Sequence, residues 1–177
     1  MSAAVAWART RPLGAGCAVV VAFAVLARYG PGSAGVIAAF ACGVLAVLAI
    51  IDLETRRLPN RIVVPAAALV LVAHLATEPG HWATWLAATF GTAAGFFALY
   101  LVYPAGLGLG DVKLALLLGA TLGSAILPAL LLGTLAGAVP AIVALARHGA
   151  AARKHALPYG PFLAFGAIVT LLLAAPR

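Results

Sequence analysis

Apolar stretches long enough to cross a lipid bilayer occupy most of this chain, and short polar or Gly/Pro-rich breaks separate them. A spanning helix needs about 20 apolar residues, within a range of about 17 to 25. Of the 177 residues, 65% are hydrophobic and only 8% are charged, which is too little polar surface to coat a soluble globule. The sequence therefore predicts an all-α, polytopic integral membrane protein with about six to seven transmembrane helices in one domain, 1–177.

The helix boundaries follow from the positions of the breaks. Glycine and proline do not weaken the helical prediction, because both are common in transmembrane helices. The first helix is expected to lie apart from the motifs described below and to act as an uncleaved anchor, because no small-x-small cleavage site ends its apolar run. The predicted helices are 12–28, 34–51, 62–77, 82–103, 111–122, 125–146 and 158–175.

The basic residues predict the orientation. With a cytoplasmic N-terminus, nine lysines and arginines fall inside and two fall outside, as the positive-inside rule requires. The formal net charge of +7 then reflects topology and contact with anionic lipid, so the lipid bilayer is an expected partner and nucleic acid is not. The nine are Arg9, Arg11, Arg56, Arg57, Arg61, Lys113, Arg147, Arg153 and Lys154, and the two are Arg28 and Arg177.

Two of the four acidic residues are the main candidates for chemistry. Asp52 and Asp111 lie where apolar helices meet short loops on the same predicted side, whereas Glu54 and Glu78 are expected in solvated loops. An ionisable group at the edge of the bilayer is costly, and it is a functional candidate by default. Asp111 at a helix start has an alternative structural role as a cap, but Asp52 at a helix end is disfavoured by the helix dipole.

Two carboxylates that meet can hydrolyse an amide, because one accepts a proton from water while the other donates one. Helix dipoles predict Asp111 as the base and Asp52 as the proton donor. Gly108 and Gly110 remove side chains from the loop before Asp111, so an extended substrate can approach closely and the loop is free to adopt positive φ angles. Lys113 either binds substrate or developing charge, or serves only as a positive-inside anchor, and Asn60 is expected to cap the following helix.

Metal ligands are not clustered in the sequence. The cysteines lie at different depths of predicted helices and the histidines fall on both sides of the membrane, so no shared site is expected. We therefore predict no metal and no cofactor. The residues concerned are Cys17, Cys42, His74, His81, His148 and His155.

Three segments together resemble one known family. They are I-D-L-E-T-R-R-L-P-N-R-I-V-V-P at 51–65, G-L-G-D-V-K-L at 108–114 and L-P-Y-G-P-F-L-A-F-G at 157–166. These are similar to the type IV prepilin peptidase family, the GxGD membrane aspartyl proteases. The resemblance implies that Asp52 and Asp111 are the catalytic pair, that the substrate is a prepilin or prepilin-like protein, and that the leader is removed at the cytoplasmic face of the cell membrane. It assigns no role to P-Y-G-P-F.

One departure from the family pattern is expected to matter. The larger members resemble bifunctional enzymes with an N-terminal segment of two Cys-x-x-Cys pairs, whereas this chain has two cysteines in all and reaches its first helix within about a dozen residues. We therefore expect the short form, which cleaves without methylating. Two alternatives stay open: a presenilin-type intramembrane protease, echoed in A-L-P at 156–158, and a proton- or ion-coupled transporter.

Overall fold

A computed structural model describes residues 3–104, 106–148 and 158–174 of the chain. All of its secondary structure within these ranges is helical. The helices are α1 (Ala3–Tyr29), α2 (Ser33–Thr55), α3 (Asn60–Thr77), the 3-10 turn η1 (Pro79–His81), α4 (Trp82–Val102), α5 (Leu109–Leu122), the 3-10 turn η2 (Gly123–Ala125), α6 (Ile126–His148) and α7 (Gly160–Leu173). Arg153, Lys154, His155 and Arg177, which the sequence analysis used, lie outside the described residues.

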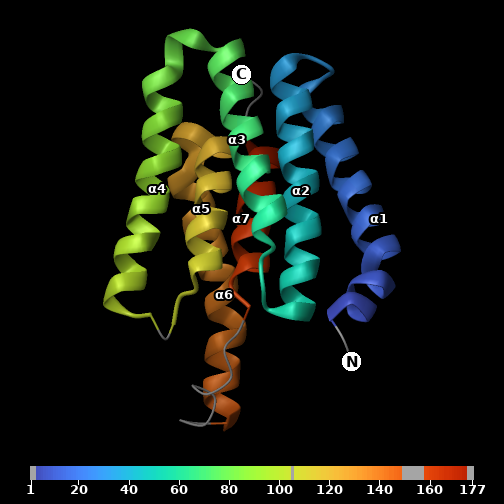
Figure 1. Ribbon diagram of the computed structural model, residues 1–177, viewed down its shortest axis with the longest axis vertical. Coiled ribbons are helices and arrows are strands. Elements are labelled where there is room, and N and C mark those ends of the chain that lie inside the picture. The colour runs from blue at the N-terminus through green and yellow to red at the C-terminus, as the bar shows by residue number, and fades with distance from the viewer. Residues whose placement is uncertain (1–2, 105, 149–157, 175–177) are drawn as a thin grey trace.

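The helices run alternately up and down in one bundle (Figure 1). α1, α3, α5 and α7 begin at the lower end of Figure 1, and α2, α4 and α6 run toward that end. We call this end the polar end, because residues 56–59, residues 106–108 and the first turn of α7 all lie there. Segments far apart in sequence therefore meet at the polar end.

Several of the helices are long and apolar enough to cross a membrane. They are Ser33–Thr55, Asn60–Thr77, Pro79–Val102 and the helical run Leu109–Arg147, and Gly14–Tyr29 and Gly160–Leu173 are shorter apolar helices. Gly123, with φ of 53°, divides the Leu109–Arg147 run, so that α5 and α6 have opposite directions (Figure 1). The prediction of an all-α polytopic membrane protein is confirmed, and the break predicted at 123–124 is present.

Several predicted helix ends differ from the structure, including the start of α5 at Leu109 instead of residue 111, and the largest differences are in α1 and α2. α1 begins at Ala3 and not at residue 12, so the helix extends N-terminally past the apolar run that predicted it. α2 continues to Thr55, where the hydroxyl donates to the carbonyl of Ile51 at 2.8 Å. Asp52 therefore lies inside the last turn of α2 and does not close the helix. α3 begins two residues earlier than predicted, with Pro59 at its N-cap position in place of the expected Asn60.

The end of α2 has a defined stop signal. The N–H of Arg56 donates to the carbonyl of Asp52 at 2.8 Å, and Arg56 has φ of 52° and ψ of 33°. A left-handed residue after the last turn satisfies a free carbonyl and turns the chain out of the helix, although glycine is the usual residue there. The left-handed conformation of Arg56 thus starts the short connection to α3.

Small residues let the helices approach closely in the core. A Cβ added to Gly119 would lie 2.3 Å from the carbonyl oxygen of Ala88 in α4, and one added to Gly166 would lie 2.3 Å from that of Ala129 in α6. Such close backbone approach is typical of membrane helix pairs, which lack a hydrophobic driving force between them. Around these contacts, Leu45, Leu114, Leu117, Leu118 and Leu163 are almost fully buried.

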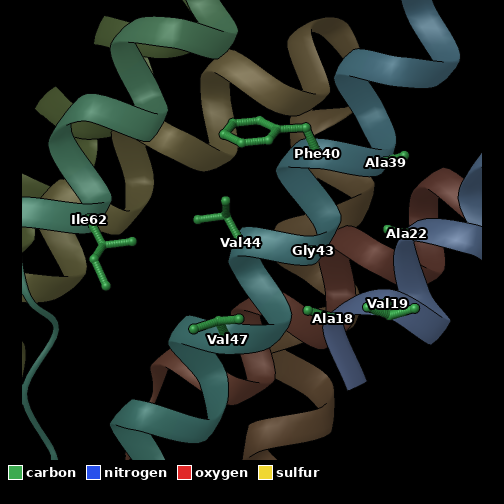
Figure 2. A pocket seen from close by; sticks show the side chains of 9 residues that line it. All are labelled: Ala18, Val19, Ala22, Ala39, Phe40, Gly43, Val44, Val47 and Ile62. Atoms are coloured by element: carbon green, nitrogen blue, oxygen red, sulfur yellow. The ribbon is translucent and has the colours of Figure 1, made fainter. Parts of the chain in front are cut away.

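An apolar groove runs along the outside of α2 (Figure 2). Its volume is about 470 Å³, and Figure 2 shows side chains of α1 on one side and Ile62 of α3 on the other. Its lining has no ionisable side chain, so it suits an acyl chain or another apolar group. The lining residues are Ala18, Val19, Ala22, Ala39, Phe40, Gly43, Val44, Val47 and Ile62.

An aromatic and acidic cluster lies at the opposite end of the bundle. The His74 ring stacks on Trp85 with centroids 3.6 Å apart, and Trp85 Nε1 donates to Glu78 Oε2 at 3.3 Å. Glu78 lies in the connection after α3, as predicted, but it is partly buried and its hydrogen bond joins this connection to α4. Glu54, also expected in a loop, is exposed but lies in the last turn of α2.

We expect Gly119→Ala to destabilise the protein by roughly 1–3 kcal/mol, because its methyl group meets the α4 backbone, which cannot move away without separating two helices. Gly95→Ala is the control, since a Cβ there meets nothing within 4 Å. It should leave the free energy of unfolding unchanged or raise it by up to about 1 kcal/mol, because alanine is the better helix former. Unfolding in mixed micelles, followed by tryptophan fluorescence, measures both; equal stability of the two variants would contradict the packing argument.

Candidate active site

A cavity of about 300 Å³ opens at the polar end of the bundle. It receives residues from the end of α2, the turn to α3 and the start of α5. Both acids that the sequence singled out line it, so the expectation that Asp52 and Asp111 meet at one site agrees with the geometry. The lining residues are Asp52, Arg56, Arg57, Leu58, Asn60, Gly108, Gly110 and Asp111.

Asp52 is the more deeply placed acid. It is 6% exposed, and its Oδ2 accepts a hydrogen bond of 3.1 Å from the backbone N–H of Gly160, the first residue of α7. The N-terminus of a helix carries free N–H groups and the positive end of the helix dipole. Asp52 therefore faces the favourable end of α7 as well as the unfavourable end of its own helix. The assignment of proton donor and base from the dipoles of α2 and α5 alone omitted this contribution.

Asp111 lies in the first turn of α5 and is partly buried. Its Oδ2 accepts the backbone N–H of Gly108 at 3.0 Å, the backward bond that an acidic residue makes at the third position of a helix. The capping role considered for Asp111 is thus present. A carboxylate has about four acceptor positions, so this bond leaves the group able to accept others.

α5 is short for a spanning element, and this places Asp111 inside the bundle. Its 14 residues, at about 1.5 Å each, extend about 21 Å, whereas the hydrocarbon core is about 30 Å thick. In Figure 1, α5 begins higher than the lower ends of α2 and α4. Asp111 is therefore recessed relative to the ends of its neighbours.

The glycines before Asp111 do not have positive φ angles. Gly108 has φ of −92°, and Gly110 is not among the positive-φ glycines. A Cβ at Gly108 would lie 3.5 Å from Asp111 Oδ2 and one at Gly110 3.5 Å from Leu58 Cβ, both ordinary contacts. The conformational freedom that glycine offers is therefore not used at these two positions. Both glycines contribute backbone without a side chain to the cavity wall.

Lys113 and Asn60 contact each other. Lys113 Nζ donates to Asn60 Oδ1 at 2.9 Å, which joins the first turn of α5 to the first turn of α3. Asn60 lines the cavity and makes no side-chain capping bond, so the prediction that it caps α3 was wrong. Lys113 is not among the lining residues, and its ammonium group acts here as a link between two helices.

Sequence reasoning missed four residues at this site. Arg56 and Arg57 had been explained by topology alone, but both line the cavity beside the acids. Gly160 and Tyr159 lie in the P-Y-G-P-F segment, which was noticed but given no role. Tyr159 is partly buried, and burial together with the nearby Asp111 carboxylate raises the pKa of its hydroxyl above the ordinary value.

Comparison with known families identifies the family of this chain. Residues 39–143 match the model of the type IV leader peptidase family, and this range contains both acids. The match covers more than half of the chain, so the chain belongs to the type IV leader peptidase family. The resemblance read from the sequence motifs is confirmed.

Curated relatives carry the name prepilin leader peptidase/N-methyltransferase. A protein of Burkholderia pseudomallei (strain 1026b) is 34% identical over 165 residues, covering 88% of this chain and 52% of the relative. One of Pseudomonas putida is 32% identical over 166 residues (89% and 56%), and one of Bacillus subtilis (strain 168) is 31% identical over 136 residues (72% and 52%). The chain spans about half the length of these relatives. The comparison with solved structures found no match.

We expect Lys113 and Asn60 to be energetically coupled. Lys113→Met and Asn60→Leu should each lower the free energy of unfolding, and the double variant should lose less than the sum by roughly 0.5–1.5 kcal/mol. The control pair is Lys113→Met with Glu54→Gln, which make no contact of this kind and should add within about 0.5 kcal/mol. If the losses in free energy of unfolding for Lys113→Met and Asn60→Leu were additive, the hydrogen bond between them would not stabilise the contact of α3 with α5.

Proposed function

We propose that this protein is a membrane aspartyl endopeptidase that removes the leader peptide of prepilins or prepilin-like proteins, with Asp52 and Asp111 as its catalytic pair. The observation that carries the proposal is that two acids 59 positions apart, on α2 and α5, line one cavity at one end of a membrane bundle. Membership of the type IV leader peptidase family and the names of the relatives supply the substrate class.

The chemistry needs one charged and one neutral carboxyl group. In a confined cavity, two like charges disfavour each other, so the pair holds one shared proton. The ionised carboxylate takes a proton from water as the water oxygen bonds to the scissile carbonyl carbon. At the same time the neutral carboxyl group donates its proton to the carbonyl oxygen, which gives a tetrahedral diol. The proton taken from water then passes to the leaving amine as the C–N bond breaks, and one diol hydroxyl returns its proton to the other carboxylate as the carbonyl re-forms. The cycle ends with the proton shared again.

The surroundings of the acids suit an extended peptide. Gly108 and Gly110 contribute backbone without side chains, so the substrate main chain can approach Asp111 closely. Lys113 is proposed to act on substrate through Asn60, which it holds in the cavity wall. The apolar segment of the substrate stays in lipid, while its polar leader enters the cavity.

We place the active site at the cytoplasmic face of the cell membrane. The turn that carries Arg56 and Arg57 and the start of α5 with Lys113 lie at the same end of the bundle as the cavity. An excess of basic residues marks the cytoplasmic end of membrane helices. This supports a cytoplasmic polar end and an N-terminus on the same side.

The position of the cavity also favours the proposed peptidase over a transporter and over a presenilin-type protease. Transporters hold their ionisable groups near the middle of the membrane, whereas Asp52 lies in the last turn of α2 and Asp111 in the first turn of α5. A presenilin-type protease cuts inside a hydrophobic helix. A pair at the end of the bundle favours a cut at the junction between leader and helix.

Asp52→Asn and Asp111→Asn should each lower the rate of leader removal by roughly 10²- to 10⁴-fold, because each variant lacks one of the two proton-transfer groups. The measurement is cleavage of a co-reconstituted prepilin by variants that accumulate in the membrane. Glu54→Gln is the matched control, since Glu54 lies two residues from Asp52 in the same turn but is exposed. A near wild-type rate in either aspartate variant would disprove the pair.

The cut should fall at the junction of leader and hydrophobic segment, on the cytoplasmic side. Mass spectrometry of the released leader identifies the bond, and a protease-protection assay in inverted vesicles reports the side. A product cut within the hydrophobic segment would instead support the presenilin-type alternative.

A further inference from the structure

The first turn of α7 directs one backbone N–H group at Asp52. The carbonyl of Tyr159 accepts the N–H groups of Phe162 and Leu163, both at 3.2 Å, and so starts the helix. The first N–H groups of a helix have no partner within it, and Pro161, one residue further on, has no N–H at all. The N–H of Gly160 is therefore left to bond outside the helix, and it donates to Asp52 Oδ2 at 3.1 Å.

The absence of a side chain at Gly160 is as important as its N–H. A Cβ there would lie 2.7 Å from Asp52 Oδ2, 3.2 Å from its Cγ and 3.5 Å from its Cβ. Contacts of real Cβ atoms essentially never fall below 3.0 Å. All three near atoms belong to the Asp52 side chain, whose end can rotate. An added methyl group would therefore displace the carboxylate before it displaced a helix.

Gly166, on the same helix, provides the opposite case. A Cβ there would meet backbone atoms of α6, 2.3 Å from the carbonyl oxygen of Ala129 and 2.5 Å from the nitrogen of Gly133. Backbone cannot rotate away, so the two helices would have to separate. Gly160 and Gly166 are both buried glycines of α7, but only Gly160 contacts an acid.

We infer that Gly160 is a positioning residue for Asp52, holding the carboxylate toward the cavity through its N–H and leaving room for it through its missing side chain. Its effect on cleavage rests on the proposed function, whereas its effect on the Asp52 carboxylate does not. The P-Y-G-P segment thereby gains a physical role: Tyr159 starts the helix, Gly160 presents the N–H and Pro161 removes the competing donor.

The test compares Gly160→Ala with Gly166→Ala. Gly160→Ala should lower kcat for leader removal by roughly 10- to 10²-fold, as expected for a small misplacement of a catalytic group, with KM changed less than about threefold. Its melting temperature should stay near that of the wild type. Gly166→Ala should lower the melting temperature, while its folded fraction keeps a normal kcat. A normal kcat in Gly160→Ala, or a loss confined to KM, would overturn the inference.

An infrared measurement reports on the carboxylate itself and needs no activity. The Asp52 carboxyl bands are identified by their loss in Asp52→Asn. They should change in frequency in Gly160→Ala and not in Gly166→Ala. If Asp52→Asn still cleaves while the bands change in Gly160→Ala, the proposed function fails and the positioning role stands. Unchanged bands refute the positioning role even if Asp52 is catalytic.

A double variant covers the case in which Gly160→Ala fails to accumulate. In Asp52→Ala the atoms that the new methyl group would meet at 2.7 and 3.2 Å are absent. Asp52→Ala/Gly160→Ala should therefore accumulate and melt as Asp52→Ala does. Failure of the double variant to fold would assign Gly160 a general packing role and overturn the inference.

Discussion

The lipid bilayer offers no hydrogen bonds to a peptide backbone, and this constraint determines where polar chemistry can occur in the protein. Each spanning segment has to satisfy its own N–H and C=O groups, so the described chain is a set of helices. Free donors and acceptors remain only where helices begin and end. The cavity with Asp52 and Asp111 forms at such ends, where the last turn of α2 meets the first turns of α5 and α7.

The same constraint explains why so many functional contacts here involve the main chain. The carbonyl of Asp52 binds the N–H of Arg56, its side chain binds the N–H of Gly160, and Asp111 binds the N–H of Gly108. The bonds from Gly160 and Gly108 each give a carboxyl group a main-chain donor. The proposed catalytic pair is thus held mainly by the helix termini themselves.

Much of the architecture could be predicted, because hydrophobic runs and basic residues respond directly to the bilayer. The runs predicted each α-helix of the described residues, though not the two 3-10 turns, and the break at 123–124 was placed correctly. Asp52 and Asp111 were found because carboxylates are rare in the chain.

The predicted helix ends were less accurate. α2 continues past its apolar run to Thr55, since backbone hydrogen bonding does not stop where hydrophobicity does. The Asn60 cap was a local expectation, whereas the side chain of Asn60 instead accepts a hydrogen bond from Lys113 of α5. The contact of Gly160 with Asp52 joins residues 108 positions apart, and no local pattern encodes that pairing.

The separation between Asp52 and Gly160 has a consequence for biogenesis. A chain inserted from its N-terminus places α2 and α5 in the membrane before α7 has been synthesised, so both acids are present before the N–H that orients Asp52 exists. α7 thus joins the bundle after α2 and α5, and a nascent or truncated chain ending before residue 160 contains both carboxyl groups without the contact that holds one of them. Under the proposed function, this order leaves the catalytic pair without its α7 contact until α7 joins the bundle.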